Sequence, residues 1–199
     1  AGGWLADLGA LDFAGGTVVH ISSGVAGLAV AIALGPRKGV RTAEAAPPHN
    51  MSFVVLGAGL LWIGWFGFNA GSTLSAGKHG AHVFLMTHIA ASAGALTWAM
   101  IESIYRQRVT ALGVASGGVA GLVSIPPACG FVNLPGALAI GVGAGAICYF
   151  GVMLKDRLGF DDALDAFGLH GIGGAWGAIA TGIFAVSSVG GTAGLLEGN

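Results

Sequence analysis

Five long stretches without Asp, Glu, Lys or Arg constrain this chain more than any other feature of its sequence. They cover residues 13–36, 45–77, 79–101, 109–154 and 166–196. A helix needs about 20 consecutive apolar residues to cross the hydrocarbon core of a bilayer, and each of these stretches is longer than that. The sequence therefore predicts an all-α polytopic membrane protein.

The composition excludes the other broad classes of protein. Only 9% of the 199 residues are charged, 54% are hydrophobic and 38 are glycine, whereas about 25% of a typical soluble domain is charged. A chain this apolar cannot cover a globular surface with water-compatible groups, and it lacks the polar composition of a disordered segment. A net charge of -1 also gives no basic surface for nucleic acid.

The stretch 109–154 is long enough for two crossings, because Pro126-Pro127, Asn133 and Pro135-Gly136 supply a turn near its middle. We therefore expect six spans. They cover about residues 14–34, 53–74, 82–101, 109–125, 137–154 and 167–187.

The basic residues predict which loops face the cytoplasm. Loops between successive spans alternate sides, and cytoplasmic loops carry an excess of Lys and Arg. Seven of the eight basic residues fall in alternate loops, namely Arg37, Lys38, Arg41, Arg106, Arg108, Lys155 and Arg157; Lys78 is the exception. We expect a multi-pass protein of the cell membrane with loops 35–50, 102–108 and 155–161 in the cytoplasm.

One spaced pattern, D-x7-H-x3-G-x2-G, occurs in both the first and the last span. The first copy runs from Asp12 to Gly27 and the second from Asp162 to Gly177. Five crossings separate the two starts, so the two helices run in opposite directions, as in an inverted-topology repeat. Chance matching in a glycine-rich chain is the alternative.

Both copies place a histidine deep in the apolar layer. His20 and His170 follow the aspartate of each copy by eight residues, which is about 12 Å along a helix axis. Burial disfavours an imidazolium, so each ring is expected to be neutral, with one donor and one acceptor. Two such rings indicate a pathway for a small hydrogen-bonding solute. Alternatively, each histidine only bonds a neighbouring carbonyl group.

The aspartates have a simpler interpretation as helix caps. Asp12 precedes the first span, where a carboxylate can accept backbone N–H groups, and Asp162 or Asp165 could do the same for the last span. The other histidines, His49, His79, His82 and His88, lack partners at ligand spacing. We interpret them as structural and predict no metal and no cofactor.

An aromatic cluster lies near one end of the second span, at residues 64–72. Its rings could form an interfacial belt. They could also face a pore mouth, where their negative faces attract a cation. The sequence does not separate these two interpretations.

At this level of detail the chain resembles the ammonium transporter (Amt/Mep/Rh) superfamily, and within it the Amt branch. The resemblance rests on four motifs in order, found at residues 12–24, 65–72, 126–130 and 165–171. Members have eleven spans in an inverted-repeat channel fold. The resemblance implies that residues 1–199 form a partial domain with the fifth through tenth spans.

The resemblance also implies a role for six residues. His20 and His170 would be the twin pore histidines, and Phe68 would be one of two stacked gate phenylalanines. Ser72 and Trp65 would belong to the outer vestibule, where ammonium is recruited, and Asp12 would support that vestibule without touching ammonium. Ammonium would lose its proton there, and ammonia would then pass the gate and the histidines.

Similar proteins serve nitrogen uptake as homotrimers, and a P-II-type nitrogen regulator often docks on their cytoplasmic face. The resemblance therefore implies a transporter and not an enzyme, and the chain has no H-E-x-x-H or G-x-S-x-G pattern for a hydrolase. The alternative function is an ammonium sensor that uses the same pore fold.

Overall fold

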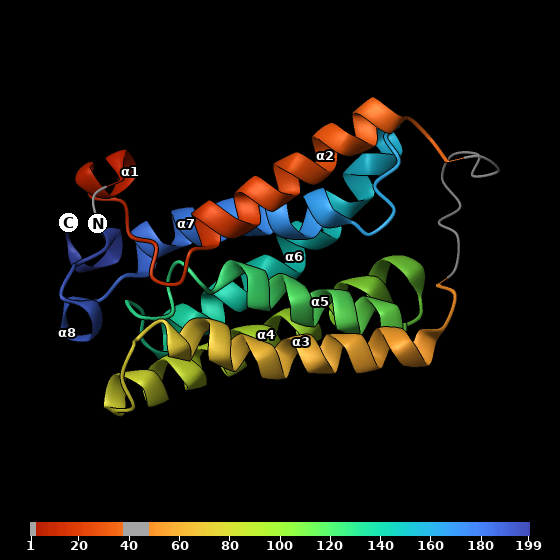
Figure 1. Ribbon diagram of the computed structural model, residues 1–199. Helices are drawn as coiled ribbons and strands as arrows, with labels where there is room; N and C mark the ends of the chain where they lie inside the picture. The colour runs from red at the N-terminus through yellow and green to blue at the C-terminus, as the bar shows by residue number, and fades with distance from the viewer. Residues whose placement is uncertain (1–2, 38–47) are drawn as a thin grey trace.

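Helices form nearly all the regular structure of the computed structural model, which describes residues 3–37 and 48–199 (Figure 1). These residues contain no strand beyond an isolated bridge between Val132 and Ala185. The elements are α1 Trp4–Asp7, η1 Gly16–Ile21, α2 Ser22–Leu34, α3 Met51–Gly71, α4 Lys78–Arg106, α5 Ala111–Ser124, α6 Leu134–Leu158, η2 Phe167–Gly171, α7 Ile172–Phe184, α8 Ser187–Gly190 and η3 Leu195–Glu197. The all-α fold class is confirmed.

Two of the long helices open with a π-helical turn, the wide form in which N–H groups bond five residues back. The turn η1 runs directly into α2, and η2 runs directly into α7. Their chain directions are opposite, and the first turn of each helix packs on the other helix (Figure 1). The two copies of the sequence repeat therefore meet in space.

The core of the molecule lies between α4, α5 and α6, which form its most extensive helix contacts. Glycines let these helices approach until their backbones touch: a Cβ on Gly94 would lie 3.0 Å from the backbone nitrogen of Gly121, and one on Gly145 would lie 2.8 Å from Cβ of Thr97. Small residues allow dense packing where there is no hydrophobic drive between helices in lipid. Most glycines of these spans thus serve helix packing.

Helix lies at every predicted span, but the spans predicted at 53–74 and 167–187 run past the ends of α3 and α7, and two other helices are longer than expected. The span predicted at 82–101 is α4, Lys78–Arg106, and the span at 137–154 is α6, Leu134–Leu158. Charged residues interrupt the apolar pattern of these two helices without ending either of them. The loop expected over 102–108 is accordingly short, and residues 155–158 of the loop expected over 155–161 belong to α6.

Glu102 explains how α4 turns into α5. Its carboxylate is 3% exposed and accepts hydrogen bonds from both the backbone nitrogen and the hydroxyl of Thr110, each at 2.9 Å. The Thr110 hydroxyl in turn accepts a bond from Gly113 N at 2.9 Å and so caps α5. A charged residue that the sequence places in a loop therefore closes a buried turn.

Four helical segments of the described residues are long and apolar enough to cross a membrane: residues 16–34, 51–71, 78–106 and 134–158. The helix α5 is apolar but shorter, and α7 with η2 covers residues 167–184. The count of six crossings stays a prediction.

Most basic residues of the described chain lie at one end of the bundle, together with Asp161, Asp162 and Asp165. Arg37 follows α2 and binds Asp161, which follows α6, and Arg106 at the end of α4 contacts Met153 near the end of α6. The three segments predicted to share one side of the membrane thus meet at this end, called the basic end below. Lys38 and Arg41 lie outside the described residues. The termini, α1 and α8 lie at the opposite end (Figure 1).

Candidate functional site

The two histidines of the repeat contact one another inside the bundle. His20 in η1 and His170 in η2 have their Nδ1 atoms 3.2 Å apart, with ring centroids 5.3 Å apart. His20 is 4% exposed. A bond between two ring nitrogens needs one donor and one acceptor. One ring therefore carries its proton on Nδ1 and the other leaves that nitrogen unprotonated.

The aspartate of each copy begins the π-helical turn that carries its histidine. Oδ2 of Asp12 accepts a hydrogen bond from Thr17 N at 3.1 Å, and Oδ2 of Asp162 accepts one from Phe167 N at 2.7 Å. Each bond spans five residues. Both aspartates satisfy free N–H groups at a helix start, where a negative charge is also favoured. Of the two residues considered for the last span, Asp162 is the cap.

The glycine four residues after each histidine lies where the helices cross. A Cβ on Gly24 would lie 2.9 Å from the carbonyl carbon of His170, and one on Gly174 would lie 3.1 Å from Ile21 N and 3.2 Å from Cβ of His20. The H-x3-G spacing thus sets each glycine against the histidine turn of the other copy. This reciprocal contact brings the two rings together.

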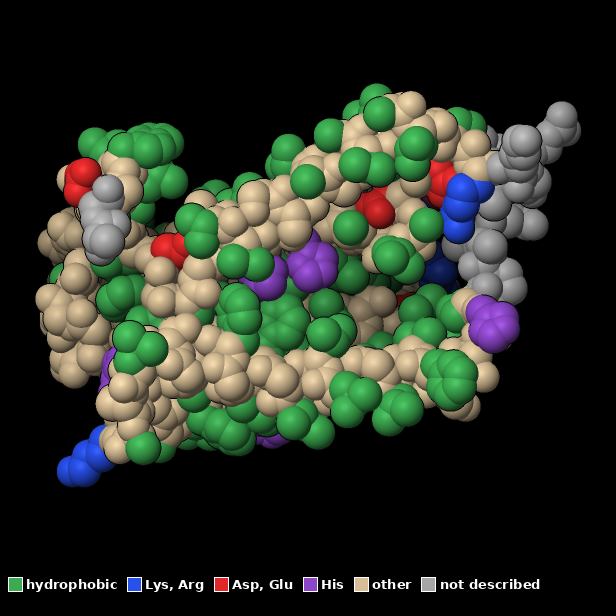
Figure 2. Space-filling view, in the orientation of Figure 1, with side chains coloured by type: hydrophobic (Ala, Val, Ile, Leu, Met, Phe, Trp, Pro, Cys, Tyr) green, Lys and Arg blue, Asp and Glu red, His purple; other side chains and the backbone are tan. Residues whose placement is uncertain are grey.

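Aromatic side chains of α3 pack against one side of the His20–His170 pair and form a wall there. Trp65 stacks on His20 with centroids 5.2 Å apart and planes 18° apart. The Phe68 ring lies 5.8 Å from His20 and 5.7 Å from Trp65. Figure 2 shows histidine side chains in a hollow between the helices, with hydrophobic side chains around them.

Four polar side-chain atoms of the described residues are buried without a hydrogen-bond partner among those residues: Asp12 Oδ1, His20 Nε2, Trp65 Nε1 and Asn69 Oδ1. An unpartnered buried donor or acceptor is costly. The free ring nitrogens of the stacked His20 and Trp65 suit a small solute that forms hydrogen bonds.

The remaining predicted site residue, Ser72, lies away from the histidines. It follows the last turn of α3, where its hydroxyl donates to the carbonyl oxygen of Phe68 at 2.8 Å. Seven residues separate it from Trp65, about 10 Å along the helix axis. The structure thus groups Trp65 and Phe68 with the histidine pair and sets Ser72 beyond them, towards the end opposite the basic end.

Comparison with known proteins settles the family. The family model described as Ammonium Transporter Family matches residues 1–199. The chain belongs to the ammonium transporter family. It is 55% identical over 189 residues to the ammonium transporter of Bacillus subtilis, a match that covers 94% of this chain and 46% of that protein. It is 48% identical over 198 residues to ammonium transporter Amt1 of Archaeoglobus fulgidus, covering 100% and 50%.

Solved structures give the same result. The crystal structure of Candida albicans Mep2 superposes with a TM-score of 0.92 at 39% identity, covering 99% of this chain and 46% of that one. A structure titled Sensor Amt Protein superposes with a TM-score of 0.88 at 34% identity, covering 95% and 48%. The chain spans about half the length of the curated relatives it matches. Its relatives are named transporters, which places it in a membrane transporter family and not among enzymes.

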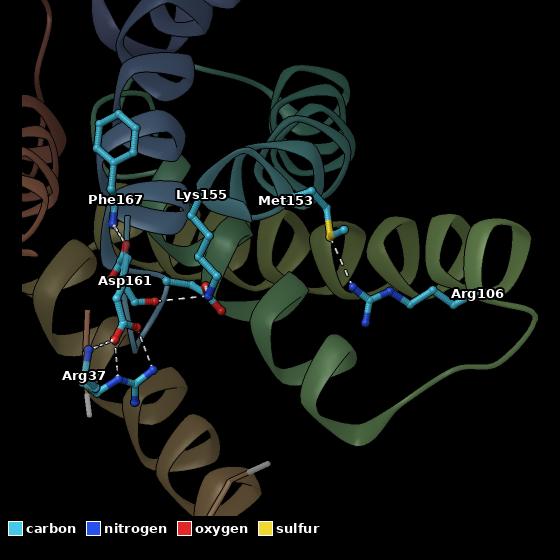
Figure 3. Close-up of polar contacts among 8 residues, drawn as sticks. Arg37, Arg106, Met153, Lys155, Asp161 and Phe167 are labelled. Atoms are coloured by element: carbon cyan, nitrogen blue, oxygen red, sulfur yellow. Dashed lines mark hydrogen bonds and ion pairs between the residues drawn. The ribbon is translucent and has the colours of Figure 1, made fainter. Parts of the chain in front are cut away.

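This ammonium transporter chain also holds charged contacts that the sequence analysis missed, at the basic end (Figure 3). Lys155 of α6 forms an ion pair with Asp165 and donates to the carbonyl oxygen of Asp162 at 3.1 Å. Arg37 donates hydrogen bonds from Nε and Nη2 to the Asp161 carboxylate, each at 2.7 Å. These bonds lower the pKa of Asp161 to about 2.

Asp165 differs from Asp161 in its surroundings. Burial raises the pKa of Asp165, and the contacts with Lys155 offset this effect only in part. Its backbone φ of 55° is in the left-handed region, which aspartate adopts more readily than most residues other than glycine. The sequence offered one signal for this contact, a lysine seven residues before the aspartate that begins the second repeat.

The other histidines have ordinary roles. His82 Nε2 lies 2.9 Å from the carbonyl oxygen of Val132, and the His79 ring packs against the edge of Phe13 at 5.5 Å. His88 packs beside Trp62. Within residues 3–37 and 48–199, no three His, Cys, Asp or Glu side chains are arranged to hold a metal ion.

Proposed function

We propose that this chain forms part of a channel-type transporter that recruits ammonium at an outer vestibule and conducts ammonia past His20 and His170. The observation that supports this most directly is the 3.2 Å approach of the two Nδ1 atoms, made by antiparallel copies of one motif. A pair of neutral rings offers hydrogen bonds to a passing solute without placing a charge in the apolar lumen.

The recruitment step uses the end of the path opposite the basic end. Ser72 offers a hydroxyl, and the aromatic rings of Trp65 and Phe68 attract a cation through their faces. Ammonium can donate a hydrogen bond to the hydroxyl and also lie against the rings, whereas potassium has no hydrogen to donate. Asp12 caps the first histidine turn and keeps one carboxylate oxygen buried and unpartnered, so it supports the vestibule electrostatically without being its ligand.

The conduction step follows loss of a proton from ammonium. Phe68 acts as a gate because its ring lies between the Ser72 end of α3 and His20. Trp65 forms the wall that joins the vestibule to the histidines, as its stacking on His20 indicates. Ammonia then meets the histidine pair, which can donate to it or accept from it.

The basic residues indicate how the protein lies in the membrane. The basic end faces the cytoplasm, with the loops around 35–50, 102–108 and 155–161, because seven of the eight basic residues lie in them. The protein that carries this chain assembles as a homotrimer in the cell membrane, and a P-II-type regulator docks on the basic end.

An ammonium sensor is the second candidate function. It is favoured by the similarity to the structure titled Sensor Amt Protein. A sensor would bind ammonium in the same path without sustained flux. A flux assay on the full-length protein separates the two functions.

The histidines provide the test of transport. In a full-length protein that carries this chain, His20→Ala and His170→Ala should each change ammonium flux or its discrimination against potassium. The double variant should cost less than the sum of the singles, since the rings share one contact. The measurement is flux in liposomes at matched protein content, and His49→Ala, at an exposed histidine before α3, is the matched control. Wild-type flux and selectivity in all three histidine-pair variants would contradict the proposal.

A further inference from the structure

The two histidine turns are attached to the rest of the protein in different ways. The residues after Asp12 are held by backbone bonds: Phe13 N donates to Pro127 O at 3.1 Å and Ala14 N to Pro126 O at 3.0 Å. The residues after Asp162 are held by the side chain of Lys155, which reaches across from α6. The first turn is thus anchored by main-chain hydrogen bonds, whereas the second is anchored by hydrogen bonds from a lysine side chain.

The Lys155 contacts connect directly to the turn that carries His170. Lys155 binds the carbonyl oxygen of Asp162 and the carboxylate of Asp165. The carboxylate of Asp162 accepts from Phe167 N, and the carbonyl oxygen of Asp165 accepts from Leu169 N at 2.9 Å. Two bonds in series therefore link the side-chain amino group of Lys155 to η2, in which His170 directly follows Leu169.

The energetics favour a positional role for this ion pair over a stabilising one. Lys155 and Asp165 have side chains only 17% and 26% exposed, so both lose hydration, and burial dominates the raised pKa of Asp165. An ion pair in such surroundings adds little net stability. It does restrict the geometry of an aspartate in the left-handed conformation.

We propose that Lys155 is a positioning residue for His170: by fixing the turn 162–165 it sets the orientation of the imidazole towards His20. This inference rests on the proposed role of the histidine pair in ammonia conduction. Lys155 lies at the end of α6 and contacts neither ring, so it acts on the path only through η2.

The test uses nitrogen-15 labelled histidine in the full-length protein that carries this chain, reconstituted in bilayers. The His170 Nδ1 resonance is identified by its loss in His170→Ala. Lys155→Met should move that resonance and leave the His79 and His82 resonances in place, and Lys155→Arg should return it towards its original position. Arg157→Met is the matched control, because Arg157 lies in the same final turn, is exposed, and makes no side-chain hydrogen bond within the described residues.

Flux gives a second readout. Lys155→Met should lower maximal ammonium flux about fivefold, in the range of long-distance coupling, with an unchanged KM, because recruitment occurs at the other end of the path. Should Lys155→Met not fold, Asp165→Asn carries the same expectations for the resonance and the flux.

The outcomes separate this inference from the proposed function. A His170 resonance that stays in place in folded Lys155→Met, or in Asp165→Asn, overturns the positioning role whatever the flux. A resonance that moves while His170→Ala and His20→Ala transport normally supports the positioning role and contradicts the proposed conduction past the histidines.

Discussion

The two histidine helices share a motif, a π-helical first turn and an aspartate cap, but they are held by different means. In the first copy, the Asp12 carboxylate makes longer bonds, 3.1 Å to Thr17 N and 3.4 Å to Val18 N, and has one oxygen unpartnered. In the second, Asp162 makes one short bond of 2.7 Å and is 6% exposed. The comparison shows that the motif specifies the local turn, while the tether to the remaining helices is chosen separately in each copy.

The largest effect is expected where the copies touch. Gly24 meets the backbone of Gly171, which cannot move aside, whereas the neighbours of Gly174 include the Ile21 side chain at 3.0 Å. Gly24→Ala should therefore lower the free energy of unfolding by about 3 kcal/mol and Gly174→Ala by about 1 kcal/mol.

Thermal unfolding in detergent measures both glycine variants. Gly182→Ala is the control, because a Cβ there meets nothing within 4 Å. Equal losses for Gly24→Ala and Gly174→Ala would show that the crossing is symmetric in energy as well as in sequence.

An effect smaller than that of Gly24→Ala is expected from the caps. Replacing a capping aspartate by alanine removes the bonds to the first N–H groups of the turn, at a cost of about 0.5–2 kcal/mol. Asp162→Ala should lie near the upper limit because its bond is short and buried, and Asp12→Ala should lie nearer the lower limit. Thermal unfolding of the two variants side by side checks the order, and a larger loss for Asp12→Ala would reverse the comparison.

The smallest effect concerns Arg37, which follows α2 of the first copy and binds Asp161, the residue before the second copy. The pKa of Asp161 is about 2 in the folded protein, below its ordinary value near 4. The ion pair therefore stabilises the fold above about pH 4 and loses its contribution as the pH falls towards 2.

Arg37→Met should consequently unfold at a slightly lower temperature than wild type at pH 6 and at the same temperature near pH 2. Added salt should shrink the difference at pH 6, since the arginine is half exposed. A difference that persists unchanged at low pH would mean that Arg37 acts by packing and not by its charge.

The sequence predicted the local features of this fold well, because each depends on neighbouring residues. The lengths of the uncharged stretches indicated helices, and helix is present at every predicted span. The aspartate before each histidine indicated a cap, and both Asp12 and Asp162 accept bonds at the start of a turn. The family followed from four short motifs and is confirmed by the match over residues 1–199.

Only the tertiary structure decided which residues distant in the chain contact one another. The repeat predicted that His20 and His170 lie equally deep in the apolar layer. The 3.2 Å approach of their Nδ1 atoms, however, depends on Gly24 and Gly174 at a helix crossing. No local pattern predicts that Lys155 contacts the turn after Asp162, because a lysine just beyond an apolar stretch is expected in a loop. Local preference determines a helix and its cap within a few residues, whereas the choice of partner depends on packing summed over the whole bundle.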